Sequence, residues 1–138
     1  MGSHSFLKNS KNKDIFININ GTLFHRNEAK ISVFDSGFLL GDGVWEGIRL
    51  HQSTLVFIDE HLNRLFRSAE GISLNIPLSK KDILKEINRV LEKNLMKDDV
   101  HIRLIISGGD KITPYQNPNA NVGPINFVII PEFKKTNP

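Results

Sequence analysis

The sequence predicts an α+β domain: a small, mixed, mainly antiparallel sheet and two helices, in the order strands, two helices, two strands. Short stretches that alternate apolar and polar side chains are typical of half-buried strands. Two later segments carry apolar residues at intervals of three and four, which is typical of amphipathic helices. The pair Asn20-Gly21 between two alternating stretches favours the tight turn of an antiparallel hairpin.

This first hairpin joins a strand predicted at 14–20 to a short strand at 22–24. The residues before it, 1–13, are polar, and the first five, MGSHS, look like a tag scar. We therefore expect a flexible lead-in over 1–13 and the start of the domain at residue 14.

A glycine-rich turn around Asp42 leads into the central predicted strand, 44–51. Successive side chains of a strand point to opposite faces, so Trp45, Gly47 and Arg49 share one face. An aromatic ring beside a guanidinium suits a pocket wall that accepts a planar anion. The alternative is a sheet face that is half open to water and has no ligand.

The first predicted helix follows a short partner strand at 55–58, and Asp59 is its expected N-cap. Its apolar stripe buries one side, and His61 and Arg64 lie on a neighbouring side at helical spacing. This basic side is either a solvated flank or an anion site near the start of the helix.

A second helix is predicted from the capping box that Ser79 and Asp82 form. After it, the strand predicted at 100–107 places His101 and Arg103 on the face opposite its aliphatic residues. An imidazole and a guanidinium on one face could line a pocket, although such a pair on an edge strand is ordinarily solvated.

The last part of the domain consists of a long loop and a final strand. The loop, 108–124, is rich in Gly, Pro and Asn and carries Tyr115, and loops of this length inside a domain are usually functional or mobile. An apolar strand is predicted at 125–130. The domain is expected to end at residue 131, and 132–138 is expected to be an interdomain linker.

Composition excludes several classes of function. The chain has no cysteine, which removes disulfides and thiolate metal sites, and we expect no metal site of other kinds. The net charge of +3 is spread among acidic residues, so nucleic-acid binding is not expected. No apolar run is long enough for a bilayer, so we expect a soluble protein that does not bind membranes. The absence of cysteine is compatible with the cytosol, and we expect a cytoplasmic protein.

Several spaced motifs together resemble one known family. The motifs are Asp35-x-Gly37, Gly41 to Arg49, Glu60 to Leu65 with Ser68-Ala69, Val100 to Leu104, and Ser107 to Gly109. In this order they resemble the N-terminal domain of fold-type IV pyridoxal-phosphate aminotransferases, which include branched-chain and D-amino-acid aminotransferases, R-selective amine transaminases and aminodeoxychorismate lyase. The resemblance covers nearly all of the chain after about residue 14. It implies the N-terminal half of the D-amino-acid aminotransferase-like fold.

The resemblance also implies roles for individual residues. Arg64 corresponds to the arginine that contacts the phosphate of the cofactor, pyridoxal 5'-phosphate. Trp45 stands where these enzymes place an aromatic residue against the substrate side chain. His101 and Arg103 occupy a strand that lines the substrate pocket of branched-chain enzymes, and Arg49 is a further candidate for this pocket.

Three further positions concern the substrate. Leu40 replaces a tyrosine that some branched-chain enzymes carry, so a hydroxyl group from the partner subunit is not expected here. Gly108 replaces an arginine of the D-amino-acid enzymes, which argues against a carboxylate trap of that type. Tyr115 belongs to a region that the family uses at its dimer interface or as a lid, where it could add an aromatic wall.

The resemblance implies an enzyme of which this chain is one part. The family's Schiff-base lysine belongs to a C-terminal domain, and no lysine here replaces it, so we expect no catalytic residue in the chain and no activity from it alone. The expected whole is a homodimer that transfers an amino group between an amino acid, branched-chain in type, or an amine and a 2-oxo acid. The alternatives are an aminodeoxychorismate lyase and a standalone, non-catalytic binding module.

Overall fold

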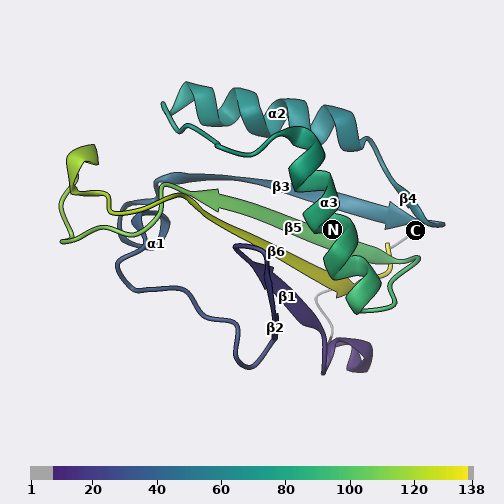
Figure 1. Ribbon diagram of the computed structural model, residues 1–138. Coiled ribbons are helices and arrows are strands. Elements are labelled where there is room, and N and C mark those ends of the chain that lie inside the picture. The colour runs from purple at the N-terminus through teal and green to yellow at the C-terminus, as the bar shows by residue number, and fades with distance from the viewer. Residues whose placement is uncertain (1–7, 137–138) are drawn as a thin grey trace.

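A computed structural model describes residues 8–136 of the chain (Figure 1). The tag scar expected at 1–5 and the last two residues of the expected linker lie outside the described residues. The order of elements is η1 (Ser10–Asn12), β1 (Phe16–Ile19), β2 (Thr22–His25), α1 (Ser36–Leu40), β3 (Gly43–His51), β4 (Thr54–Leu55), α2 (Ile58–Gly71), α3 (Lys80–Lys93), β5 (Val100–Ser107), η2 (Pro118–Ala120) and β6 (Asn126–Phe133).

The strands form one six-stranded sheet in the order β2-β1-β6-β5-β3-β4. Every pairing between the strands of the described part is antiparallel. The predicted α+β class is confirmed, and the sheet is more regular than the mixed sheet that we expected. Along Gly43 to Ile48, β3 has no strand partner on its outer side within residues 8–136, because β4 pairs only with Leu50 and His51. This part of β3 is called the open edge below.

Helices α2 and α3 lie over the same face of the sheet, as Figure 1 shows. Their apolar stripes pack on the inward-pointing residues of β3, β5 and β6, and Ile48, Leu65, Ile87 and Ile102 are fully buried between the two layers. The alternation predicted for β3 and β5 is confirmed, since every second residue of each strand is buried in this core. The opposite face of the sheet has no helix over it in the described part and is called the open face.

The predicted Asn20-Gly21 hairpin is also confirmed. Both residues have positive φ, and β1 and β2 pair directly on either side of them. The preceding stretch is tied to the domain as well, because the Asn12 side chain bonds the backbone of Phe133 through both its amide nitrogen and its oxygen. The proposed division of the chain into lead-in, domain and linker stays a prediction.

Three local predictions were wrong in the central unit. The partner strand expected at 55–58 is the two-residue strand β4, Thr54–Leu55, and Ile58 already belongs to α2. The glycine-rich turn contains a third helix, α1, because the Asp35 carboxylate caps it at Phe38 N and Gly41 ends it in the left-handed conformation. Helix α2 begins at Ile58 without Asp59 as its N-cap, since the chain turns at Phe57 with a φ of 52°. Asp59 lies in the first turn, where its negative charge interacts favourably with the helix dipole.

The final strand runs to Phe133, three residues beyond its predicted end at 130. It continues through Pro131, although proline cannot donate to a sheet ladder. In the structure β1 pairs with β6 only at Val128 and Ile129, so Pro131 has a strand partner on one side alone, Ile102 of β5. Proline is tolerated there for the same reason as on an edge strand.

Candidate functional site on the two sides of the open edge

The open face carries an aromatic and cationic pair built from neighbouring strands. The Arg103 guanidinium lies 3.9 Å from the centre of the Trp45 ring, a cation–π contact between β5 and β3. Arg103 is paired in register with Gly47, two residues from Trp45, so the two side chains meet diagonally across the strands. Trp45 is nevertheless 60% exposed, which leaves much of its apolar surface available to a ligand.

His101 lies on the same face, beside Gly47. A β-carbon at Gly47 would stand 3.0 Å from His101 Nε2, so the imidazole lies over a position that has no side chain. Arg49 is paired with His101 in register, and its guanidinium donates a hydrogen bond to the Lys134 carbonyl. Trp45, Arg49, His101 and Arg103 therefore share the open face, because β3 and β5 are paired neighbours whose predicted faces coincide.

The helix-covered side of β3 carries a second polar cluster. Glu46 points toward α2 from the middle of an aliphatic row, and its side chain is only 3% exposed. Arg64 Nε donates to Glu46 Oε1 at 2.7 Å and Arg64 Nη2 donates to Oε2 at 2.7 Å, a two-pronged ion pair. His61 Nδ1 lies 2.8 Å from the same Oε2.

The charge of Glu46 follows from these partners. The hydrogen bonds from Arg64 lower the pKa of the Glu46 carboxyl, and His61 lowers it further, against the opposing effect of burial. Glu46 is therefore ionised at neutral pH and can only accept hydrogen bonds. It follows that His61 carries a proton on Nδ1.

Arg64 presents its other edge to the outside. Its side chain is 60% exposed, and within residues 8–136 its Nη1 has no hydrogen-bond partner. A guanidinium held on one edge and open on the other fits an oxyanion such as a phosphate. Arg64 is thus the described residue that fits the phosphate end of the implied cofactor.

Within residues 8–136, the phosphate-binding candidate, Arg64, is not accompanied by a lysine suited to bind the aldehyde group of the cofactor. Lys111 is buried, but its ammonium donates to the Asn121 side chain and the Asn117 carbonyl, and so it holds the long loop together. No group of three or more histidine or acidic residues in the described part could hold a metal ion.

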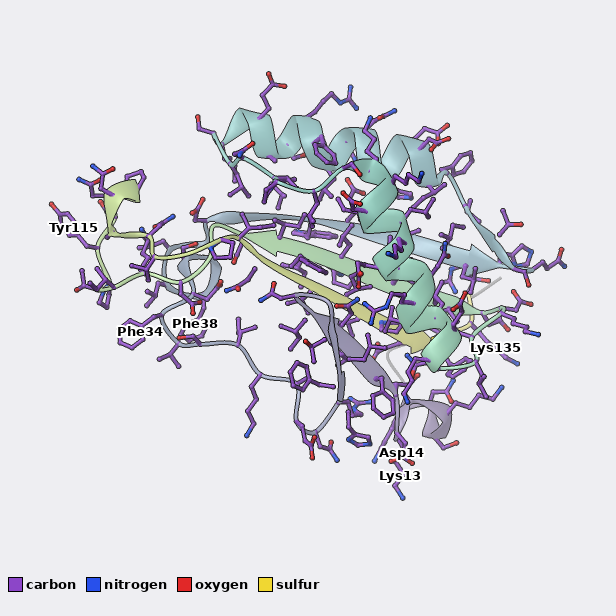
Figure 2. The ribbon with its side chains drawn as sticks, in the orientation of Figure 1. Lys13, Asp14, Phe34, Phe38, Tyr115 and Lys135 are labelled. Atoms are coloured by element: carbon purple, nitrogen blue, oxygen red, sulfur yellow. The ribbon has the colours of Figure 1, made fainter. Side chains whose placement is uncertain are left out.

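Leu40 and Tyr115 come from α1 and the long loop, outside the two strands that carry Trp45, Arg49, His101 and Arg103. Tyr115 is on the long loop at one end of the molecule, near Phe34 and Phe38, and Lys135 lies toward the other end (Figure 2). Leu40 ends α1 at the same end as Tyr115, and both side chains are exposed.

Gly108 lies where the sheet meets α1, and it has no room for a side chain. A β-carbon there would stand 2.2 Å from an oxygen of the Asp42 carboxylate and 2.8 Å from Ser36 Oγ. Nearby, the buried Asp35 carboxylate accepts hydrogen bonds from Ser107 Oγ and Asn126 Nδ2. This network joins the start of α1 to the adjacent ends of β5 and β6.

Sequence reasoning missed Glu46 as a site residue. The alternation placed it on the core face, where it had no assigned role. One signal could have found it: a lone carboxylate in an apolar strand face, followed by a helix that carries His61 and Arg64 three residues apart. Such a carboxylate needs a cationic partner, and this helix packs on that face.

The fold and these clusters agree with the comparisons with known proteins. The sequence profile of the family described as amino-transferase class IV matches residues 43–132, which include β3 to β5 and nearly all of β6. The chain therefore belongs to the class IV aminotransferases.

Two curated relatives illustrate the range of the family. The chain is 37% identical over 109 residues to branched-chain-amino-acid aminotransferase-like protein 1 of Arabidopsis thaliana, which covers 79% of this chain and 20% of that protein. It is 36% identical over 94 residues to the aminodeoxychorismate lyase of Bacillus subtilis, which covers 67% of this chain and 32% of that protein. The chain spans a third or less of the length of either relative.

Solved structures share the fold. One is the branched-chain amino acid aminotransferase from Escherichia coli, with a TM-score of 0.75 and 26% identity, and the match covers 87% of this chain and 41% of that chain. No helix within residues 8–136 is both long and apolar enough to cross a membrane.

Proposed function

We propose that the chain is the substrate-pocket domain of a pyridoxal-phosphate-dependent aminotransferase. The enzyme would transfer an amino group between an amino acid, branched-chain in type, or an amine and a 2-oxo acid. One observation carries the proposal: Arg64 on one side of β3, and the Trp45–Arg103 pair on the other, flank the same open edge. Because Glu46 and Trp45 are consecutive residues, a ligand at this edge could reach both clusters.

Arg64 would hold the cofactor by its phosphate. The exposed edge of its guanidinium offers donors for phosphate oxygens, and its inner edge is already fixed by Glu46. When bound, the cofactor supplies the electron sink that amino transfer requires. The lysine that carries the cofactor would belong to the C-terminal domain of the whole enzyme.

The open face would form one wall of the substrate pocket. Trp45 offers an apolar surface to an aliphatic side chain, and Arg103, stacked on it, offers planar donors to a carboxylate of the 2-oxo acid. His101 and Arg49 extend the polar side of this wall. The Asp42 carboxylate occupies the space above Gly108, which supports a pocket without the arginine of the D-amino-acid enzymes.

The end of the domain that carries α1 and the long loop would face a second subunit. Leu40 and Tyr115 are exposed at this end, together with other apolar side chains. Lys135, which follows β6, lies toward the opposite end of the molecule. We propose that the enzyme is a cytoplasmic homodimer, in which these two residues line the partner's pocket.

Activity assays of the whole enzyme test the proposal. We expect amino transfer from a branched-chain amino acid to a 2-oxo acid. Arg103→Leu should lower kcat/KM for the 2-oxo acid by about 10- to 100-fold, the value of hydrogen bonds to a charged group. The control, Ile72→Ala, changes an exposed apolar residue at the end of α2 and should leave kcat/KM unchanged.

Aminodeoxychorismate lyase is the second candidate, because a relative of similar identity carries that name. The same preparation can be given aminodeoxychorismate and assayed for release of pyruvate. Pyruvate release without amino transfer would favour the lyase and overturn the aminotransferase proposal.

A further inference from the structure

Glu46 is a buried carboxylate in a row that is otherwise aliphatic. Val44, Ile48 and Leu50 precede and follow it on the same face, and Leu104 is its partner on β5. An ionised carboxylate loses its hydration when it is buried, at a cost of several kcal/mol. An aliphatic residue would fill this position without that cost, so packing alone does not explain a glutamate here.

The geometry of the Glu46–Arg64 pair suggests that Glu46 orients the Arg64 guanidinium. Arginine side chains have many rotamers, and an exposed one loses conformational entropy when a ligand immobilises it. Here the buried carboxylate contacts Arg64 through both Nε and Nη2, which fixes the plane of the guanidinium as well as its position. Nη1 is left on the outer side of the pair.

We propose that Glu46 is a positioning residue, which holds the Arg64 guanidinium in the orientation that receives an oxyanion at the open edge of β3. The inference rests on the proposed function, in which that oxyanion is the cofactor phosphate. His61 completes the arrangement, because its Nδ1 proton satisfies the carboxylate oxygen that is shared with Arg64 Nη2. Neither Glu46 nor His61 needs to touch the ligand for this role.

Two possible effects of Glu46 on an oxyanion, orientation of Arg64 and repulsion by the negative charge, predict opposite results for one substitution. Glu46→Gln keeps the size of the side chain but removes its charge and one acceptor of the two-pronged contact. If Glu46 orients Arg64, the variant should bind an oxyanion more weakly. If its charge only repels the oxyanion, the variant should bind more tightly.

Side-chain NMR of the arginine Nε–H groups can separate these two outcomes. The probe is inorganic phosphate, added to the isotope-labelled chain while the Arg64 signal is followed. We expect phosphate to shift this signal, and Glu46→Gln to weaken the apparent affinity by about two- to tenfold, the cost of ordering one flexible side chain. Before phosphate is added, the variant's Arg64 signal should already resemble that of a solvated arginine.

The matched control is Glu86→Gln, which breaks a second glutamate–arginine pair, Glu86 with Arg89 on α3. It should change the Arg89 signal and leave phosphate binding at Arg64 unchanged. Equal or tighter phosphate binding by Glu46→Gln would overturn the positioning role while leaving the phosphate role of Arg64 intact. An Arg64 signal that phosphate does not shift in the unmodified chain would overturn the phosphate role, and the inference with it.

A pH titration of the unmodified chain does not depend on the folding of a variant. The titratable or charged groups that act on Glu46 in the described part are Arg64 and His61 of α2. The titration uses sulfate as the anion. As pH falls past the ordinary glutamate pKa of about 4.3, the Arg64 signal should stay where it is at neutral pH, and it should change only at the lower pH where Glu46 protonates. A signal typical of a solvated arginine at about pH 6 would contradict the anchoring.

Discussion

Glu46 connects the candidate site to the pH dependence of stability. Its pKa is lowered in the folded chain, mainly by Arg64, so the unfolded chain binds a proton at a higher pH than the folded chain does. The stabilisation is therefore fully present above the unfolded pKa, about 4.3, and is lost as pH falls through the lower folded pKa.

We predict that Glu46→Gln flattens the acid limb of the stability curve. The urea midpoint of the unmodified chain should fall more steeply below about pH 4.3 than that of the variant. Glu92→Gln, at an exposed position on α3, serves as the control and should keep the original slope. Parallel curves for Glu46→Gln and the unmodified chain would contradict the ion pair.

Gly109 should be the glycine that is least tolerant of substitution. It has a φ of +87°, and a β-carbon there would stand 2.1 Å from the Pro124 carbonyl oxygen, a backbone atom that cannot rotate away. Gly109→Ala should lower the free energy of unfolding by about 2–4 kcal/mol through strain and overpacking together.

Gly71 provides the control for this glycine prediction, because it ends α2 with open space around its α-carbon. Gly71→Ala should raise the free energy of unfolding by up to about 1 kcal/mol. Urea denaturation of both variants checks the pair, and a tolerated alanine at Gly109 would be inconsistent with the described loop.

The strand faces on which site residues lie could be predicted from the sequence, but the contact between Glu46 and Arg64 could not, for a physical reason. The faces of Trp45, Arg49, His101 and Arg103 follow from alternation along two strands, which is a local property. The Glu46–Arg64 contact depends on where α2 lies across β3, and the sequence periodicity does not give that placement. The assigned roles of the site residues stay predictions.

At the scale of elements, the β3–β4 turn carries strain that one substitution should relieve. Gln52 and Ser53 both have positive φ in a two-residue hairpin loop, where asparagine and glycine are preferred. Ser53→Gly should raise the free energy of unfolding by about 0.5–1 kcal/mol, since glycine has no steric penalty at this φ. Thermal unfolding checks it, and an unchanged or lower midpoint would contradict this turn geometry.

The elements that sequence reasoning placed correctly are those with strong local signals. Asn20-Gly21 fixes the first hairpin and the Ser79–Asp82 capping box starts α3. The early start of α2 had no such signal, because Phe57, the residue before it, has a left-handed conformation that is rare for a bulky side chain. The continuation of β6 through Pro131 likewise depends on pairing with β5, a contact that is distant in sequence.

At the scale of the whole molecule, exposed apolar side chains at the end that carries α1 and the long loop predict self-association. They are Val33, Phe34, Phe38, Leu40, Ile112, Tyr115 and Val122. Large exposed apolar patches mark interaction sites. We expect the chain to form dimers or larger species and to bind a hydrophobic dye.

Sedimentation measured over a range of concentrations checks this prediction. Phe38→Ser should shift the distribution toward monomer, because Phe38 is among the most exposed of these residues. Leu95→Ser, at an exposed residue after α3, is the control and should have no effect. A monomer at high concentration that binds no dye would contradict the assignment of this end as an interface.

We propose that this chain contributes the phosphate contact and a pocket wall, and that the lysine that carries the cofactor belongs to another part of the enzyme. The most direct measurement is to mix the chain with pyridoxal phosphate, reduce with borohydride and map the labelled lysines by mass spectrometry. We predict sparse labelling spread over exposed lysines, with Lys111 protected by its hydrogen bonds to Asn117 and Asn121. Stoichiometric labelling of a single lysine would instead place the cofactor-carrying lysine on this chain and make the chain an enzyme in its own right.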